Sequence, residues 1–209
     1  MMTKELSLEN LVRDLTYIVF STHVHQFLFE LFPPRESAAI LEPGCGSAKF
    51  SLSYALKGCH VWGIDIDPQV IEYAHRLQGA LSMLAKRTLN IDLRVGDIHH
   101  LEFPDHSFDL VFNEGVSQHW PDEEKRQGSI NEMTRVSRDM VIIIGNNGLN
   151  PEEQRIDREF RFGYCGMPPT RKCFTPLELE DRMTKAGLFG VRVRALDATL
   201  IAGYGRKHG

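Results

Sequence analysis

Short, uninterrupted apolar runs recur between residues 38 and 144, and longer segments with apolar residues at helical spacing separate them. Continuous runs, in contrast to alternating ones, are typical of strands that helices cover on both faces. Strands that alternate with helices favour a parallel, doubly wound α/β sheet. The pattern predicts five strands in this part of the chain, at residues 38–41, 60–64, 91–95, 108–113 and 140–144.

The segments between these runs carry helix signals. Residues 68–87 have an apolar face, with Asp67 suited to the N-cap and Pro68 to the first turn. Residues 121–136 include acidic residues near their start, which favour the positive end of a helix dipole. Residues 5–32, before the first strand, also have helical spacing.

The last part of the chain predicts a helix followed by a hairpin. Thr175 and Glu178 match a capping box, and Gly187 ends the helix about three turns later. Two further strands, at residues 191–196 and 199–204, are joined by a link so short that it allows only an antiparallel hairpin. We therefore predict a doubly wound, mostly parallel seven-stranded sheet with an antiparallel last strand and helices on both faces.

The length of 209 residues fits a single domain, since open α/β sheets commonly use such a length as one unit. Within it we expect an N-terminal helical lid, a cofactor-binding half, a long connection that acts as a lid or substrate loop, and a C-terminal helix with the hairpin. These parts span residues 1–37, 38–145, 146–175 and 176–209.

Composition narrows the class of protein. The net charge of -4 argues against a nucleic-acid partner, which usually requires a basic surface. The four cysteines form no CxxC pair, so neither a zinc site nor a disulfide framework is indicated. No apolar run approaches the roughly 18 residues of a membrane span, and no segment is of signal-peptide type. We expect a cytoplasmic protein with reduced thiols.

A glycine-rich turn, Glu42-Pro43-Gly44-Cys45-Gly46, stands where the first predicted strand meets a helix. Gly44 can adopt backbone angles closed to other residues, and Gly46 lets a ligand approach the main chain. Ligands of open α/β sheets bind at the carboxyl ends of strands, where N–H groups at helix starts are exposed. A plain tight turn is the alternative interpretation.

Polar residues follow the next three strands and favour the ligand-binding interpretation. Asp65 stands about 20 positions after the glycine turn, where a carboxylate can accept hydrogen bonds from two ribose hydroxyls. Asp97 ends the third strand and could accept from an adenine amino group, although an ordinary loop aspartate is the alternative. The fourth strand ends in the turn Asn113-Glu114-Gly115.

The order and spacing of these residues resemble class I S-adenosylmethionine (SAM)-dependent methyltransferases, over residues 38 to 204. Glu42, Gly44 and Gly46 resemble the first motif of the family, and residues 108–113 resemble its fourth-strand motif facing the methyl donor. The resemblance implies SAM as cofactor, with Glu42 near the methionine amino group. The cofactor-binding residues so implied are Glu42, Gly44, Cys45, Gly46, Asp65 and Ile66 in the first two strands, Asp97 and Ile98 after the third, and Asn113.

The sequence departs from the family pattern at two places. Ala48 replaces the third glycine of the first motif, and Ser137-Arg138-Asp139 stands where a proline-glycine-glycine turn often precedes the fifth strand. A nicotinamide-dependent oxidoreductase is a rival, but its fingerprint requires a small residue where this chain has Lys49. A second alternative is a protein that binds the cofactor without catalysis and acts through a partner.

Methyl transfer from a sulfonium requires an acceptor electron pair in line with the methyl group, so positioning supplies much of the rate. If the acceptor is a hydroxyl or a protonated amine, a base helps. The candidates are His119 and Glu114, just past the fourth strand, with a structural histidine and a ligand-positioning or capping glutamate as the alternatives. Trp120 could stack on adenine or line the acceptor site. The pair His99-His100 lacks the spacing of metal ligands, so we predict no metal site.

We expect the acceptor to be a small molecule, because little of the chain lies outside the predicted catalytic domain. Tyr17, Arg161 and Tyr164 could contact it from the two lids, while Cys165 and Cys173 are interpreted as inert thiols. The aromatic residues near the N-terminus could form an acceptor pocket, a homodimer interface or simply core; they are Phe20, Phe27, Phe29 and Phe32.

Overall fold

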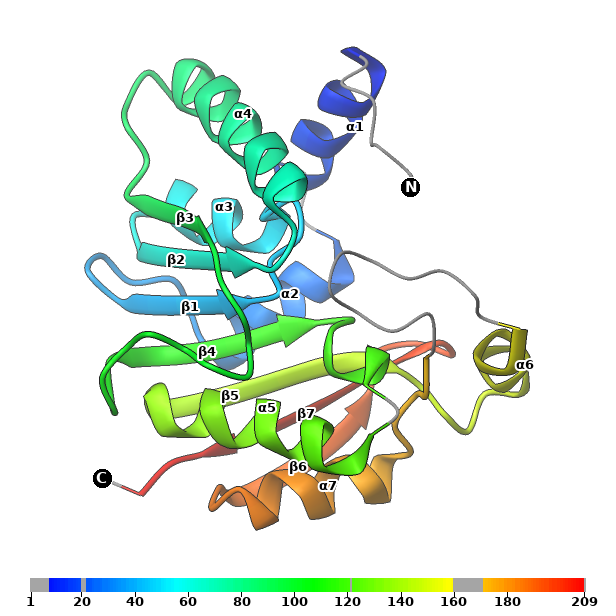
Figure 1. The fold of residues 1–209 in the computed structure, drawn as a ribbon. Coiled ribbons are helices and arrows are strands. Elements are labelled where there is room, and N and C mark those ends of the chain that lie inside the picture. Colours follow the sequence, from blue (N-terminus) through cyan, green and yellow to red (C-terminus); the bar gives the residue numbers. More distant parts are fainter. Residues whose placement is uncertain (1–7, 20–21, 121, 160–170, 209) are drawn as a thin grey trace.

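The computed structural model of the chain describes residues 8–19, 22–120, 122–159 and 171–208, and its centre is one seven-stranded sheet (Figure 1). The order of the strands across the sheet is β3-β2-β1-β4-β5-β7-β6. All seven predicted strands are present. Their bounds are β1 Ala39–Pro43, β2 His60–Asp65, β3 Ile91–Val95, β4 Phe108–Glu114, β5 Ser137–Asn146, β6 Phe189–Ala195 and β7 Leu200–Arg206.

The directions of the strands confirm the predicted topology. β1 to β5 run parallel to one another, whereas β7 is antiparallel to both β5 and β6. β1 pairs with β2 on one side and β4 on the other, so the strand order reverses between β1 and β4. Open α/β sheets bind ligands at the carboxyl ends of the strands beside such a reversal.

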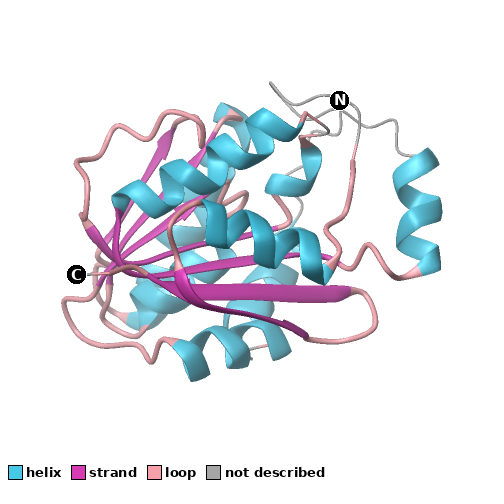
Figure 2. Cartoon of the chain, turned by 90° about the horizontal axis from the view of Figure 1, so that it is seen from below, coloured by secondary structure: helices cyan, strands magenta, loops and turns pink. Residues whose placement is uncertain are grey.

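Helices cover both faces of the sheet (Figure 2). On one face α3 and α4 pack against β2, and α1 packs on α3 and α4. On the other face α5 packs on β4 and β5, and α7 on β6 and β7. Two helices lie in the described part of the segment 5–32, which was predicted to be helical. The bounds are α1 Leu8–Val19, α2 His23–Leu31, α3 Lys49–Leu56, α4 Pro68–Ala85, α5 Glu123–Val136, α6 Pro151–Glu159 and α7 Pro176–Lys185.

The central strands alternate between two apolar cores, which explains their uninterrupted apolar sequence. In β4, Leu110 and Phe112 point into the core beneath α2, α3 and α4, while Val111 points into the core beneath α5 and α7. Phe27 and Phe32 are each 3% exposed and belong to the first of these cores. The core interpretation of these two aromatic residues is therefore confirmed, and Phe20 lies outside the described residues.

Two predicted helix caps are present, one of them in altered form. Asp67 Oδ1 accepts a hydrogen bond from Gln69 N at 2.9 Å, as an N-cap should. Thr175 Oγ1 accepts from Glu178 N at 3.2 Å, but the Glu178 carboxylate does not return to the cap. The Glu178 carboxylate accepts a hydrogen bond from Arg126 instead, at 2.8 Å, and so joins α7 to α5. Pairing a buried cation stabilises the fold more than the second hydrogen bond of a capping box would.

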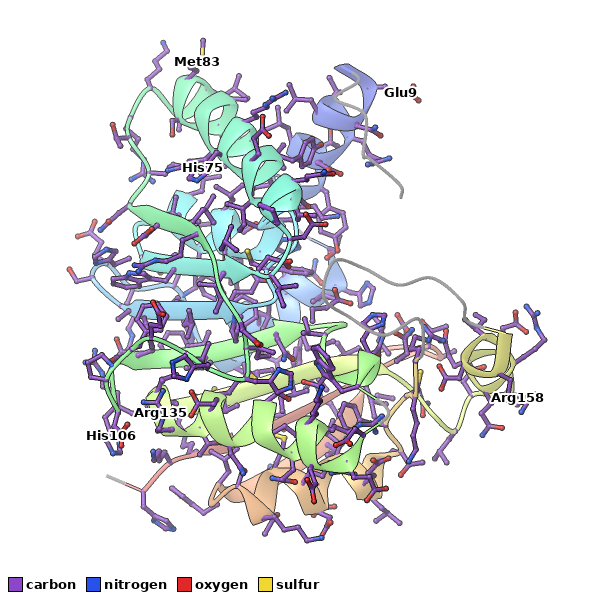
Figure 3. All side chains as sticks on the ribbon, viewed as in Figure 1. Glu9, His75, Met83, His106, Arg135 and Arg158 are labelled. Carbon is purple, nitrogen blue, oxygen red and sulfur yellow. The ribbon has the colours of Figure 1, made fainter. Side chains whose placement is uncertain are left out.

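The long connection between β5 and α7 contains α6 near its start. Arg171, just before α7, bonds to Glu153 Oε2 and Asp157 Oδ1 on α6, both at 2.7 Å. α6 with its Arg158 lies at the carboxyl edge of the sheet, and His106 and Arg135 lie at the opposite edge (Figure 3). None of the helices within the described ranges is long and apolar enough to cross a membrane.

Candidate active site at the carboxyl ends of β1, β2 and β4

The turn after β1 is held against β2 by its own main chain. Gly44 N and Cys45 N both donate to Ile64 O, at 2.7 and 2.9 Å. Gly44 has a φ of +76°, and a Cβ atom there would lie 2.4 Å from Val116 Cγ2, so only glycine fits. Gly46 has a φ of +53°, but a Cβ there would meet nothing within 4 Å. Gly44 therefore serves packing, while Gly46 presents bare main chain to open space.

Asp65 ends β2 beside this turn, and Ile66 follows it with a partly exposed side chain. Asp65 Oδ2 accepts from Gly46 N at 2.8 Å, and Oδ1 accepts from Asp67 N at 3.0 Å. Burial raises the pKa of the Asp65 carboxyl, although the N–H groups that bond to it oppose the rise. Since each carboxylate oxygen has two lone pairs, both oxygens can accept a further hydrogen bond from a ligand.

Glu42, near the end of β1, is 2% exposed. Ser51 N and Ser51 Oγ both donate to its Oε2, at 3.0 and 2.5 Å. Burial raises the pKa of Glu42 to about 8; the bonds from Ser51 lower it, and the charges of Glu114 and Asp65 add to the rise. A carboxyl in this state favours a ligand that brings a positive charge to it.

Cys45 contributes main chain to the turn, and its side chain is only 7% exposed. Burial, followed by the charges of Glu42 and Asp65, raises the pKa of the thiol well above its usual range. A buried thiol of this kind is no nucleophile, so we interpret the predicted role of Cys45 as one of its backbone.

Asp97 and Ile98 follow β3 and have opposite environments. The Asp97 side chain is 48% exposed, and its Oδ1 accepts from His99 N at 2.9 Å and from His99 Nδ1 at 3.0 Å. Burial alone would raise the pKa of Asp97, but the bonds from His99 and the charges of His99 and His100 outweigh it, and the pKa is lowered. Ile98 is 6% exposed and belongs to the core beneath α5.

Asn113 and Glu114 end β4 with side chains in different places. Asn113 is fully buried, and its Nδ2 donates to Ser117 Oγ at 3.2 Å and to Met133 Sδ at 3.3 Å. Its side chain therefore lies in the interior beneath α5, so a contact with a cofactor would involve its main chain. Glu114 is partly buried; burial raises its pKa, and the charge of Lys49 opposes this.

Tyr17 on α1 lies within electrostatic range of both glutamates. Burial raises its pKa, the hydrogen bond from Thr22 lowers it, and the charges of Glu114 and Glu42 raise it further. Lys49 Nζ lies 4.5 Å from the centroid of the Tyr17 ring. Four ionisable groups therefore lie near one another at the carboxyl ends of β1 and β4: the Tyr17 phenol, the carboxyls of Glu42 and Glu114, and the Lys49 ammonium.

The segment after β4 forms a short 3-10 helix, η1 Ser117–His119. Gln118 exchanges two hydrogen bonds with Asn146 at the end of β5, at 2.7 and 2.8 Å. His119 N donates to Val116 O at 3.0 Å, and the residue is 9% exposed. The loop that carries this candidate base is therefore tied to the sheet.

Trp120, for which we predicted a place on adenine or in the acceptor site, is only 6% exposed. It meets the His99 ring edge to face, with centroids 4.5 Å apart at 84°. Its ring thus supports the loop after β3.

Three residues predicted to matter in the long connection, Arg161, Tyr164 and Cys165, lie outside the described residues. Cys173 is buried, and its Sγ donates to Asp157 Oδ1 at 3.2 Å. Burial raises the pKa of this thiol, and Asp157 adds to the effect, which agrees with an inert thiol. Across the described ranges, no group of three histidine, cysteine, aspartate or glutamate residues could hold a metal ion.

Two contributors to the site were missed by the sequence analysis. Ser51, which holds Glu42, was not considered, and Lys49 was noted only as a mismatch to another fingerprint. Both lie in the first turn of α3, directly after the glycine turn. Side chains in the first turn of a helix point back toward its N-terminus, here toward the glycine turn. The closeness of these two residues to the glycine turn along the sequence was therefore the signal that could have identified them.

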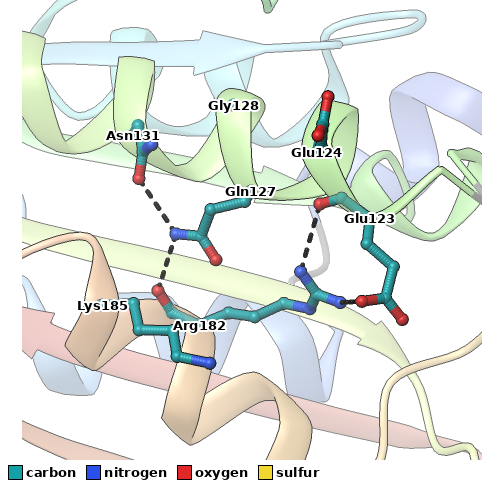
Figure 4. Close-up of a pocket in the computed structure, with 7 residues that line it drawn as sticks. All are labelled: Glu123, Glu124, Gln127, Gly128, Asn131, Arg182 and Lys185. Carbon is teal, nitrogen blue, oxygen red and sulfur yellow. Dashed lines mark hydrogen bonds and ion pairs between the residues drawn. The ribbon is translucent and has the colours of Figure 1, made fainter.

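A separate hollow of about 420 Å³ lies on the outer side of α5 and α7 (Figure 4). Its polar side chains largely bond to one another. Gln127 Nε2 donates to Asn131 Oδ1 and to Arg182 O at 2.9 and 3.0 Å, and Arg182 lies 3.8 Å from the Glu123 carboxylate. Because these groups are engaged and distant in the fold from the glycine turn, we assign the site to the carboxyl edge.

Comparison with known proteins gives the class. The model of the methyltransferase domain family matches residues 41–144, about half of the chain and the part that contains the glycine turn, Asp65, Asp97 and the end of β4. With the sheet order and the reversed last strand, this match shows that the chain belongs to the class I SAM-dependent methyltransferases. The cofactor of this family is SAM.

Two curated relatives are similar over part of their length. Ajmaline N-methyltransferase of Rauvolfia serpentina is 27% identical over 71% of this chain, and malonyl-[acyl-carrier protein] O-methyltransferase of Yersinia pestis is 29% identical over 56%. The chain spans 54% and 39% of the lengths of these relatives. A SAM-dependent methyltransferase structure from Methanosarcina mazei has a TM-score of 0.66 and 23% identity, covering 90% of this chain and 97% of that one.

Proposed function

We propose that this protein transfers the methyl group of SAM to a small-molecule acceptor bound at the carboxyl ends of β1 and β4. The observation that carries the proposal is the open space at Gly46, with the carboxyls of Glu42 and Asp65 on either side of the glycine turn. A nucleoside ligand with an attached ammonium group would satisfy both carboxyls in one bound molecule.

Different residues of the site would bind different parts of the cofactor. Asp65 would accept from the ribose hydroxyls, and Glu42 would lie near the methionine ammonium, whose charge favours the ionised carboxyl. Asp97 and the main chain of Ile98 would contact adenine, and Gly44, Cys45, Gly46, Ile66 and Asn113 would line the path between. When bound, SAM supplies an electrophilic methyl group on a sulfonium.

The acceptor side would be formed by Tyr17, Glu114 and His119. Transfer requires the acceptor atom to lie in line with the methyl group, and holding it there can contribute on the order of 7–11 kcal/mol at best. Glu114, whose pKa burial raises, is suited to take a proton from a hydroxyl or ammonium acceptor. His119 could do the same from the loop that Gln118 holds.

Three observations support a small acceptor. The curated relatives include an enzyme named for the alkaloid ajmaline and one for tocopherol. The net charge is -4, which disfavours nucleic acid. The acceptor groups lie at a buried edge beneath α1, where Tyr17 and Glu114 are each only partly exposed.

The direct test of the cofactor is calorimetric titration with SAM and S-adenosylhomocysteine (SAH), with NADH as control. We expect micromolar binding of the first two and none of NADH. Release of SAH is then followed with panels of amines, phenols, carboxylic acids and thiols. Cofactor binding without turnover of any class would favour a non-catalytic protein that acts through a partner.

The proposed base is tested with Glu114→Gln, which keeps size and removes the proton acceptor. We expect kcat to fall by about 10²–10⁴ with SAH affinity unchanged. Glu124→Gln is the matched control, because Glu124 is exposed on α5. An unchanged kcat in Glu114→Gln would mean that His119 is the general base, or that catalysis depends on positioning of the acceptor alone.

A further inference from the structure

The loop after β3 holds Asp97 by one oxygen only. Asp97 Oδ1 accepts from both the main chain and the ring of His99, at 2.9 and 3.0 Å. No residue in the described part of the chain donates to Oδ2. The loop is closed behind the carboxylate by His100 N, which donates to Asp97 O at 3.0 Å. One oxygen is therefore fixed, and the other, on a side chain that is 48% exposed, keeps its lone pairs for a ligand.

The second nitrogen of the His99 ring reaches a different element. His99 Nε2 lies 3.2 Å from Lys125 O in the first turn of α5. A carboxylate and a carbonyl can only accept hydrogen bonds, so both contacts are made only when both ring nitrogens carry hydrogen. The ring of His99 thus links the loop after β3 to the start of α5.

The surroundings of the ring are consistent with a fixed position. The edge of Trp120 packs against it, and the side chain of His99 is 21% exposed. The charged or titratable groups around it are Asp97 and His100 on its own loop and Lys125 on α5, whose Nζ lies 5.7 Å from the Trp120 ring.

We infer that His99 is a positioning residue for adenine recognition: its ring bridges the loop after β3 to α5 and so aims Asp97 Oδ2 at the amino group of the cofactor. The inference rests on the proposed function, in which Asp97 contacts adenine. His99 itself touches neither the cofactor nor the acceptor. Its effect is to keep Asp97 ionised and in one orientation, and thereby to make the site distinguish an amino group from an oxo group.

The test compares SAH with its inosine counterpart, in which an oxo group replaces the adenine amino group. A site built to accept a hydrogen bond from that amino group disfavours the analogue that lacks it. We expect the wild-type protein to bind SAH about tenfold more tightly, since a bond to a charged acceptor is worth about one order of magnitude in affinity. His99→Gln should lose most of this preference, chiefly through weaker binding of SAH.

The neighbour on the same loop supplies the control. His100→Gln makes the same chemical change at an exposed residue whose side chain has no hydrogen bond to Asp97 among the described residues, and it should keep the preference. The ratio of the two affinities is the readout because both ligands share the homocysteine end, so any effect at Glu42 cancels.

Each outcome decides the matter. An undiminished preference in His99→Gln, an equal loss in His100→Gln, or a parallel loss of affinity for both ligands would overturn the role of His99. Failure of the wild-type protein to bind SAH at all would instead overturn the proposed function, and the inference with it.

Discussion

Carboxylates at the ends of neighbouring strands have opposite properties in this protein. At the ends of β1 and β2, Glu42 and Asp65 are 2% and 9% exposed, and burial raises the pKa of both. At the end of β3, Asp97 has a side chain that is 48% exposed, and its pKa is lowered. Among the described residues, no cation compensates the burial of the first two carboxyls, whereas His99 donates two hydrogen bonds to the third.

This difference shows how one sheet edge can treat the two ends of a cofactor differently. Where a ligand brings a positive charge, the protein can bury a carboxyl without a cation of its own. Burial then disfavours the ionised carboxyl until the ligand supplies the missing charge. Where the ligand is neutral, as adenine is, the protein has to hold the anion in place itself. Residue type alone does not distinguish the two cases. They differ in how deeply the carboxyl is buried and in which side chains lie next to it.

The largest expected effect is on stability at Glu42. Its ordinary pKa is 4.5 and its folded value is about 8, so the folded protein binds more protons than the unfolded chain between these limits. Stability from this group is complete below pH 4.5 and is lost as the pH rises through 8. Glu42→Gln, which resembles the protonated form, should be more stable than wild type at pH 8 by roughly 2–4 kcal/mol and equal at pH 4.5.

Denaturation by urea at the two pH values measures this difference. Glu124→Gln, at an exposed site, should follow the wild-type protein at both. Equal stability of Glu42→Gln and wild type at pH 8 would mean that the carboxyl is ionised in the folded protein without cost, and the contrast with Asp97 would disappear.

Asp65→Asn should weaken SAH binding about 100-fold. The change replaces a charged acceptor of two hydroxyl groups with an amide, and each such bond is worth about 1.5–3 kcal/mol. The matched control is Asp92→Asn, because Asp92 is a partly exposed aspartate within β3 that pairs with Arg94. Calorimetry at one pH suffices, and similar affinities of the two variants would remove the ribose role from Asp65.

Gly46→Ala should have the smallest effect, about a tenfold loss of SAH affinity. Its Cβ would meet no protein atom, so the loss would report contact with the ligand. Gly190, at the irregularity in β6, is a fair control: its φ is +59° against +53° at Gly46, and its Cβ is equally unopposed. Both variants should lose about 1–2 kcal/mol of stability from left-handed strain, but only the first should lose affinity.

The sequence was sufficient for the sheet and for the positions of the acids, because both depend on local order along the chain. It failed where burial hides the pattern. α3 is buried on nearly all sides, with Ser51 and Ser53 among its buried residues, so it has no polar face to mark its extent. β5 begins at Ser137, earlier than its apolar run, because Arg138 and Asp139 pair with Asp109 and Arg206.

The side-chain contacts that define the site could not be predicted from the sequence. His99 and Lys125 are 26 residues apart, and Tyr17 meets Lys49 across two elements. No period or motif encodes such meetings, since they depend on how α5 and α1 pack. Asn113 illustrates the converse: its place at the end of β4 was predicted, but not that its side chain turns inward to Ser117.

Arg126 of α5 has one further consequence. Its guanidinium is 1% exposed and binds Trp120 O at 3.1 Å, Lys172 O at 2.7 Å and the Glu178 carboxylate at 2.8 Å. A cation so deeply buried cannot lose one partner cheaply. The loop after β4, the segment before α7 and α7 itself are therefore expected to unfold together, as one cooperative unit around this guanidinium.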